Sequence, residues 1–167
     1  ADRLAADHDL CLPRAGVGMR AVVQRVREAQ VVVGGETVGR IGRGLLVLLG
    51  AGPGDDDEDA DYLVGKVLGL RIFPDAEGQM NLDLSQVQGQ LLVVSQFTLF
   101  GDCRRGRRPS FSAALEPVRA EQLVTRFIER ARGAGVEVAS GRFGALMDVS
   151  LLNEGPVTLL LDSKRAF

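Results

Sequence analysis

Residues 44–51 form the longest apolar run in the chain, and this run limits the possible folds more than any other feature. Its central residues, 45–49, are all leucine or valine. A strand with one face in water alternates apolar and polar side chains, whereas a strand covered on both faces has an unbroken apolar run. The run is also far shorter than the ~20 apolar residues of a membrane-spanning helix. We therefore predict a buried strand with other elements packed on both of its faces.

The composition of the 167 residues is that of one globular domain, with 46% hydrophobic and 25% charged residues. The net charge of −2 provides no general attraction for nucleic acid, so an RNA partner would need a local basic patch. The two cysteines, Cys11 and Cys103, cannot form a disulfide framework and favour a reducing compartment.

The single histidine, His8, lies in a stretch, 1–18, that precedes Met19 and lacks clear hydrophobic periodicity. We interpret residues 1–18 as an extension that is disordered or non-native, and residues 19–167 as the folded domain. That domain has no histidine, which excludes a Ser-His-Asp triad, a Cys-His pair and a His/Cys zinc site. An enzyme built on it must work without imidazole.

Strand patterns alternate with two helical patterns after Met19. The predicted strands are 21–26, 29–33, 36–41, 45–49, 72–73, 90–94, 136–139, 147–152 and 157–161. One helix is predicted to start in the acidic run 55–61, where carboxylates would cap free N–H groups; a metal site is the less favoured explanation of this run. The other helix is predicted over 117–134. Each helix has one apolar face, so we predict a single α/β domain with layered sheet-sheet-helix (β/β/α) architecture.

A polar segment, Ser95-Gln96-Phe97-Thr98, directly follows the apolar strand at 90–94. Its polar groups either bond the local backbone in a turn or form the wall of a pocket. Thr98 could be a nucleophile, but no candidate base lies nearby in the sequence. We therefore favour main-chain N–H groups, which can stabilise an oxyanion without a titrating side chain.

Two further segments allow a structural or a functional interpretation. Asn153-Glu154-Gly155-Pro156 lies between two predicted strands, where it forms either an ordinary turn or a cis Gly-Pro bend that shapes a pocket. Four arginines within five residues, Arg104, Arg105, Arg107 and Arg108, form either a solvated loop or a loop that contacts phosphates.

Four motifs occur in order along the chain: Gln24-Arg25-Val26, Ser95-Gln96-Phe97-Thr98-Leu99, Arg108-Pro109-Ser110-Phe111-Ser112 and Asn153-Glu154-Gly155-Pro156-Val157-Thr158. Together they resemble the D-aminoacyl-tRNA deacylase family, also called the D-tyrosyl-tRNA deacylase family. The likeness runs from Met19 to about Leu161, and four ordered motifs at family-like spacing are far more specific than any one of them.

The resemblance implies the fold of that family and a homodimeric, cytoplasmic esterase without a metal or organic cofactor. It would hydrolyse the ester that joins a D-amino acid, or glycine mischarged on tRNA-Ala, to the terminal ribose of tRNA. It would reject L-aminoacyl-tRNA. The implied partners are charged tRNA and a second copy of the chain, and neither a membrane nor DNA is expected.

The resemblance also implies roles for residues. Ser95, Gln96, Phe97 and Thr98 would form the catalytic segment. Because the domain lacks histidine, attack assisted by the 2′-hydroxyl of the substrate's ribose, with the backbone at Phe97 and Thr98 holding the carbonyl, fits better than a threonine nucleophile.

The Gly-Pro element of the family corresponds to Gly155 and Pro156. It would be cis and inserted into the neighbouring subunit's pocket, where its carbonyls occupy the space that an L side chain needs. Arg25 and Asn153 would support it. The arginine cluster would bind tRNA, and Cys103 stands where many relatives carry a small polar residue.

Two other functions compete with the deacylase. A non-catalytic nucleic-acid-binding protein would use the arginine cluster alone, but the motifs and the net charge of −2 do not favour it. A relative that edits L-aminoacyl-tRNA is opposed by the Gly155-Pro156 element.

Overall fold

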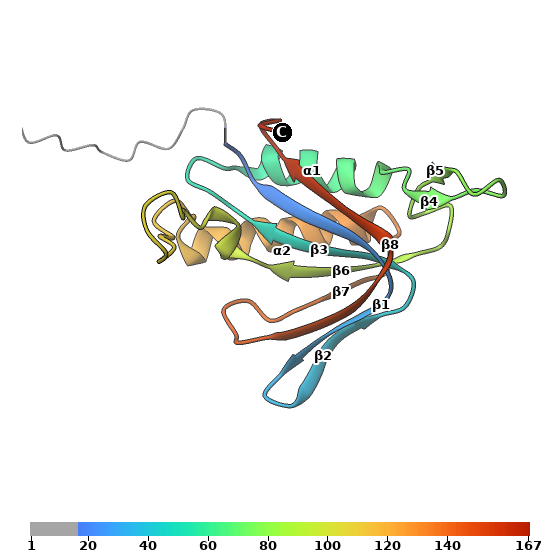
Figure 1. Cartoon of the computed structure of the whole chain (residues 1–167), viewed down its shortest axis with the longest axis horizontal. Helices are drawn as coiled ribbons and strands as arrows, with labels where there is room; N and C mark the ends of the chain where they lie inside the picture. Colours follow the sequence, from blue (N-terminus) through green and yellow to red (C-terminus); the bar gives the residue numbers. More distant parts are fainter. Residues whose placement is uncertain (1–16) are drawn as a thin grey trace, which may run out of the picture.

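The computed structural model describes residues 17–167, so residues 1–16 of the predicted extension lie outside the described residues. The described part forms one six-stranded sheet, a two-stranded sheet, two α-helices and a 3-10 helix (Figure 1). The elements in chain order are β1 (Arg20–Val33), β2 (Glu36–Ile41), β3 (Gly44–Gly50), α1 (Asp57–Gly69), β4 (Phe73–Pro74), β5 (Met80–Leu82), β6 (Gln90–Ser95), η1 (Phe97–Phe100), α2 (Pro117–Gly133), β7 (Val138–Ser140) and β8 (Asp148–Asp162).

The large sheet is organised around β1. One edge of β1 pairs antiparallel with β8, while the other edge pairs with β3 up to Val26 and with β2 from Ala29 onward. At the far ends of the sheet, β2 approaches β7: a Cβ added to Gly39 would lie 2.5 Å from the carbonyl oxygen of Ser140. The sheet therefore curls until it is nearly closed, which provides the two sheet layers of the predicted architecture.

β3, β6 and β7 are parallel neighbours, and α1 and α2 lie together on one side of them (Figure 1). Leu45, Val47 and Leu49 of β3 belong to the core that includes the buried residues of the two helices. Leu46 belongs to a second core inside the curled sheet, with residues of β1, β2 and β6. β3 is therefore covered on both faces, as its unbroken apolar run predicted.

The acidic run forms the start of α1, as predicted. The carboxylate of Asp56 accepts hydrogen bonds from the N–H groups of Glu58 and Asp59, and the carboxylate of Asp59 accepts one from Asp56 N–H. The predicted second helix is confirmed as α2, which is capped by the carboxylate of Glu116.

The interpretation of residues 153–156 as a turn between two strands is wrong. β8 is one strand from Asp148 to Asp162 and pairs with β1 on both sides of this segment. Val26 pairs with Asn153 and Gln24 with Thr158, so residues 154–157 all lie opposite Arg25 alone. The extra residues form a bulge, which we call the β8 bulge. The sequence contains the signals of a turn but does not show that the chain resumes pairing with the same neighbour.

Smaller differences affect β1 and β7. The predicted strands 21–26 and 29–33 are one strand, because Arg27 and Glu28 continue the extended backbone as exposed residues. β7 spans Val138–Ser140, so it begins two residues later and ends one residue later than the strand predicted at 136–139. Gly18, which we placed in the extension, donates its N–H to the carboxylate of Asp162.

Candidate active site

Ser95 is the last residue of β6, and the polar segment that follows it leaves the sheet as the short helix η1. Gln96 N–H still donates to Leu49 O of β3 at 2.8 Å, which continues the strand pairing by one residue. Phe97 and Thr98 are exposed, whereas Phe100 at the other end of η1 is buried. The segment thus has two fixed ends and an exposed middle.

The backbone N–H groups of Phe97 and Thr98 have no acceptor within residues 17–167. They lie at the start of η1, where no residue earlier in the helix can supply a carbonyl, and no side chain caps them. Two adjacent unpaired donors at an exposed position can hold the oxygen of an ester carbonyl.

The hydroxyl of Thr98 accepts a hydrogen bond from the side-chain amide of Gln96. An amide is not a base, and no hydrogen bond joins this hydroxyl to a carboxylate, a lysine or a histidine within the described residues. Thr98 therefore lacks the partner that activates a threonine nucleophile.

An apolar cavity of about 270 Å³ opens beside this segment. Ser95, Gln96 and Phe97 form part of its wall, and the rest comes from β3 and from two regions that sequence analysis did not select. These additional wall residues are Ala114, Leu115, Pro117, Ala120, Val124, Phe143 and Gly144. They were missed because alanine, leucine and phenylalanine in a helix or loop carry no chemical signal until the fold brings them beside β6.

The peptide bond Gly155-Pro156 is cis, as predicted, and both residues are exposed. The side chain of Arg25 links this β8 bulge to the segment that precedes β4. Its Nε donates to Glu154 O of the bulge at 3.0 Å, and its Nη1 donates to Ile72 O at 2.6 Å. The side chain of Asn153 spans the bulge, because it accepts from Val157 N–H at 2.8 Å and donates to Val157 O at 3.2 Å. Arg25 and Asn153 thus contact the bulge in the manner expected of supporting residues.

Glu154 is a further support that sequence analysis did not select. Its carboxylate lies 3.5 Å from Nε of Arg25 and 3.7 Å from Nε of Arg27. None of the residues of the β8 bulge lines the cavity beside Ser95, Gln96 and Phe97. The fold therefore does not bring the two predicted parts of the site together around this cavity within one chain.

The arginine cluster lies in an exposed loop that a bridge between Asp102 and Ser110 closes at its base. Arg104 is engaged with Asp102, and its guanidinium holds the pKa of that carboxyl well below its usual range. At the foot of the loop, Phe111 packs edge-to-face on Phe97 with 5.1 Å between ring centroids. The loop thus adjoins the segment with the free N–H groups.

Asp55 has an unusual environment close to the site. Gly52 N–H donates to Oδ2 of Asp55 at 2.6 Å. Oδ1 of Asp55 is buried without a hydrogen-bond partner in the described part of the chain. Burial raises the pKa of Asp55 to about 7. Gly52 in turn packs against the ring of Phe100, so Asp55 supports the loop beneath η1.

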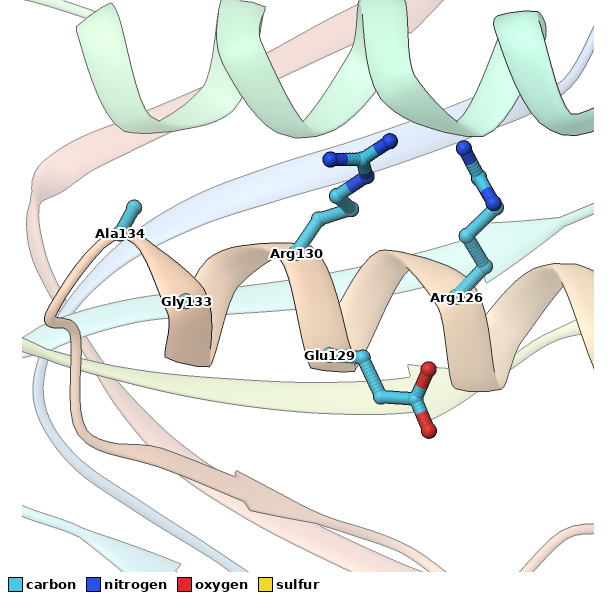
Figure 2. A pocket seen from close by; sticks show the side chains of 5 residues that line it. All are labelled: Arg126, Glu129, Arg130, Gly133 and Ala134. Atoms are coloured by element: carbon cyan, nitrogen blue, oxygen red, sulfur yellow. The ribbon is translucent and has the colours of Figure 1, made fainter.

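A second hollow lies on α2 around Arg126, Glu129 and Arg130 (Figure 2). Arg126 and Arg130 extend toward α1, where both pair with Asp61, and Glu129 points away from them (Figure 2). This hollow therefore accompanies an ion-pair network that joins the two helices.

Within residues 17–167 no group of three or more His, Cys, Asp or Glu side chains could hold a metal ion, and no helix is long and apolar enough to cross a membrane.

Known proteins share both the sequence and the fold of this chain. The family model for D-Tyr-tRNA(Tyr) deacylase matches residues 22–162. The D-aminoacyl-tRNA deacylase of Thermosipho melanesiensis is 57% identical over 150 residues, which cover 89% of this chain and 100% of that protein. The D-aminoacyl-tRNA deacylase of Desulfatibacillum aliphaticivorans is 56% identical over 146 residues, 87% of this chain and 100% of the relative.

Solved structures agree with these sequence matches. A c-Myc DNA unwinding element binding protein has a TM-score of 0.80 at 39% identity and covers 86% of this chain and 97% of its own. A probable eukaryotic D-amino acid tRNA deacylase, with a TM-score of 0.74 at 24% identity, supports the fold alone. The match across β1 to β8, together with the segments found at the end of β6 and in β8, shows that the chain belongs to the D-Tyr-tRNA(Tyr) deacylase family.

Proposed function

We propose that the protein hydrolyses the ester bond of D-aminoacyl-tRNA and releases free tRNA and a D-amino acid. The observation that carries this proposal is the pair of unpaired N–H groups at Phe97 and Thr98, beside an apolar cavity, in a chain of this family. The family membership indicates the ester, and the two donors provide a place for its carbonyl oxygen.

The cavity suits the terminal nucleoside of the substrate. Its lining is largely apolar and includes the aromatic side chains Phe97 and Phe143, and nucleobases bind well against such surfaces. A nucleoside held there would bring its esterified ribose to the edge of the cavity formed by Ser95, Gln96 and Phe97, next to the free N–H groups.

The proposed reaction uses water and the substrate's own ribose. Water attacks the ester carbonyl carbon with help from the 2′-hydroxyl, and the N–H groups of Phe97 and Thr98 stabilise the negative oxygen that forms. The bond to the ribose oxygen then breaks, that oxygen takes up one proton of the attacking water, the other proton passes to solvent, and the amino acid leaves as a carboxylate. No step needs the Thr98 hydroxyl, which is bonded to Gln96 and has no base beside it.

Selection against L-amino acids is assigned to Gly155 and Pro156 of a second subunit. Both residues are exposed on a bulge held by Arg25 and Asn153, and they do not line the cavity of their own chain. A homodimer that inserts this bulge into its partner's site would block the side of Cα where an L side chain points. Exposed leucines at Leu151, Leu152 and Leu160 of β8 support an interface on the strand that carries the bulge.

The proposed arrangement also sets the range of substrates and the place of action. Glycine has no side chain to reject, so glycine mischarged on tRNA-Ala would also be cleaved. The exposed residues Arg105, Arg107 and Arg108 would contact tRNA phosphates. We place the activity in the cytoplasm, where charged tRNA is used.

The test is a parallel incubation with D-Tyr-tRNA, L-Tyr-tRNA and Gly-tRNA, with the remaining ester measured over time. We expect loss of the D-Tyr and Gly esters and persistence of the L-Tyr ester. Stable D-Tyr-tRNA would contradict the proposed activity and leave a nucleic-acid-binding role. Cleavage of L-Tyr-tRNA as fast as D-Tyr-tRNA would contradict the role of the β8 bulge.

A further inference from the structure

Arg20 contacts the end of η1, although no pattern in the sequence assigns it a role. It is the first residue of β1, and its Nη1 donates to Leu99 O at 2.8 Å. Its guanidinium also lies 4.8 Å from the centroid of the Phe100 ring, within the range of a cation–π contact. Arg20 thus contacts the two residues that come directly after the exposed pair Phe97 and Thr98.

Asp162 faces the guanidinium as an ion-pair partner but makes no hydrogen bond with it, because Nε of Arg20 is buried without a hydrogen-bond partner in the described part of the chain. Nε of Arg20 lies 3.9 Å from Oδ2 of Asp162, whose side chain is fully buried. The Asp162 carboxylate also accepts hydrogen bonds from the N–H groups of Gly18 and Lys164, which fix its orientation. The hydrogen bond from Nη1 and the contact with the Phe100 ring, with this buried carboxylate nearby, can keep Leu99 O in a defined position.

The Phe100 ring leaves little room for η1 to shift. The ring lies so close to the backbone that a Cβ added to Gly52 would be 2.6 Å from it, and one added to Gly50 would be 3.2 Å away. At the other end of the segment, Gln96 N–H is bonded to Leu49 O. Phe97 and Thr98 lie between these two anchors, so their N–H direction depends on both.

We propose that Arg20 is a positioning residue for the deacylation reaction: it fixes Leu99 and Phe100, and thereby aims the N–H groups of Phe97 and Thr98 at the ester carbonyl. This inference rests on the proposed function. Arg20 does not line the cavity, so its loss should slow the chemical step rather than weaken substrate binding. A misplacement of about 1 Å at a reacting centre can cost on the order of 10²-fold in rate.

The test compares Arg20→Met, Arg20→Lys and a matched control, Arg71→Met. Arg71 makes the same kind of bond, from Nε to Asn81 O at 2.9 Å, but on β5. The kcat and KM are measured on D-Tyr-tRNA, and Tm is measured for every variant. For Arg20→Met we expect kcat to fall about tenfold or more with KM within about twofold. Arg20→Lys, which keeps a charged donor, should recover most of kcat, and Arg71→Met should retain it.

Arg20→Met could fail to fold because it leaves the buried Asp162 without its cation. In that case Arg20→Met/Asp162→Asn is compared with Asp162→Asn, and the same fall in kcat is expected. An unchanged kcat in a folded Arg20→Met variant, a change in KM alone, no recovery in Arg20→Lys, or an equal loss in Arg71→Met would each overturn the positioning role. A wild-type protein that does not cleave D-Tyr-tRNA would overturn the proposed function instead.

Discussion

The end of β6 and the bulge in β8 both interrupt a strand, but with opposite results. After Ser95 the chain leaves the sheet, and the interruption exposes two unpaired N–H groups beside a cavity. In β8 the chain returns to the same neighbour, so the extra residues project outward and remain braced by Arg25 and Asn153. An interrupted strand can thus make a hollow that receives a ligand or a projection that enters a neighbouring molecule.

The residues that come after each interruption account for the difference. The chain after β6 is fixed to the rest of the protein by the buried ring of Phe100 and by the hydrogen bond from Arg20 to Leu99 O. Phe97 and Thr98, which come before these contacts, remain exposed. Val157 is buried and returns β8 to the sheet, which leaves Gly155 and Pro156 outside. The proposed enzyme uses the first region for chemistry and the second for selection, so changes made in one region at a time should separate these two contributions.

The largest fall in deacylation rate is expected from a change in the substrate rather than from a change in the protein. If the end of β6 supplies only backbone donors, a D-aminoacyl-tRNA with a terminal 2′-deoxyribose should react at least about 10²-fold more slowly. Single-turnover deacylation of the deoxy and normal substrates measures this ratio, and tRNA binding by both serves as the control. Equal rates would show that the β6 region itself provides the missing catalytic group.

The second prediction concerns Gly155→Ala in the β8 bulge. The φ of Gly155 is +140°, and an added Cβ would lie 2.8 Å from Cγ2 and 2.9 Å from N of Val157. We expect D-ester cleavage to fall about tenfold or more because the bulge must shift. Gly34→Ala is the matched control, since Gly34 also has a positive φ but no atom within 4 Å of the added Cβ. Full activity of Gly155→Ala would show that the β8 bulge takes no part in the mechanism.

The third prediction uses pH, because the buried carboxyl of Asp55 titrates near neutral pH and binds Gly52, which packs against Phe100 of η1. The folded-state pKa of Asp55 is about 7, above the ordinary value of 3.8, so folding favours its protonated form. The free energy of unfolding should therefore fall as pH rises from about 4 to 7, by on the order of 2 kcal/mol after solvent screening is allowed for.

Urea unfolding of the wild type and Asp55→Asn at pH 5 and pH 8 measures this effect. Asp55→Asn should lose less stability between the two pH values, because the buried group can no longer ionise. Carboxyls with lowered pKa values, such as Asp61, titrate below this window and do not interfere. An identical pH dependence in both proteins would contradict the role of Asp55.

The fourth prediction concerns the arginine loop beside η1. Replacing Arg105, Arg107 and Arg108 with Ala should weaken tRNA binding and reduce its dependence on salt, with the slope falling by roughly 0.7–0.9 for each phosphate that the loop no longer binds. Arg104→Ala is the control and should change the slope less, because Arg104 is engaged with Asp102. Filter binding at several salt concentrations gives the slopes. A slope unchanged in the triple variant would place the tRNA on another surface.

The smallest effect is expected for Thr98→Ala. Its hydroxyl is bonded to Gln96 and has no base, so removal should change kcat less than about threefold while the backbone donors stay in place. A loss of about 10⁴-fold in a variant with the wild-type Tm would instead identify Thr98 as a side-chain nucleophile.

Much of this molecule can be predicted from local patterns. The apolar run of β3, the acidic start of α1 and the ordered motifs each depend on residues that are close together in the sequence, so their meaning can be recognised there. The residues of the cavity wall are different. Ala114, Phe143 and Gly144 resemble ordinary loop residues, and only the placement of their segments beside β6 makes them part of a site.

The sequence by itself determined the elements, the absence of histidine from residues 19–167 and the positions of the Ser95–Thr98 and Gly155-Pro156 motifs. Only the tertiary structure decided that Gly155-Pro156 is a bulge within one strand, because the pairs on its two sides, Val26 with Asn153 and Gln24 with Thr158, join residues far apart in the sequence. It also decided that Arg20, at the start of β1, holds the carbonyl of Leu99. The physical reason is that hydrogen bonds and packing between distant segments depend on the whole fold, whereas capping, apolar periodicity and motif spacing are local properties of the chain.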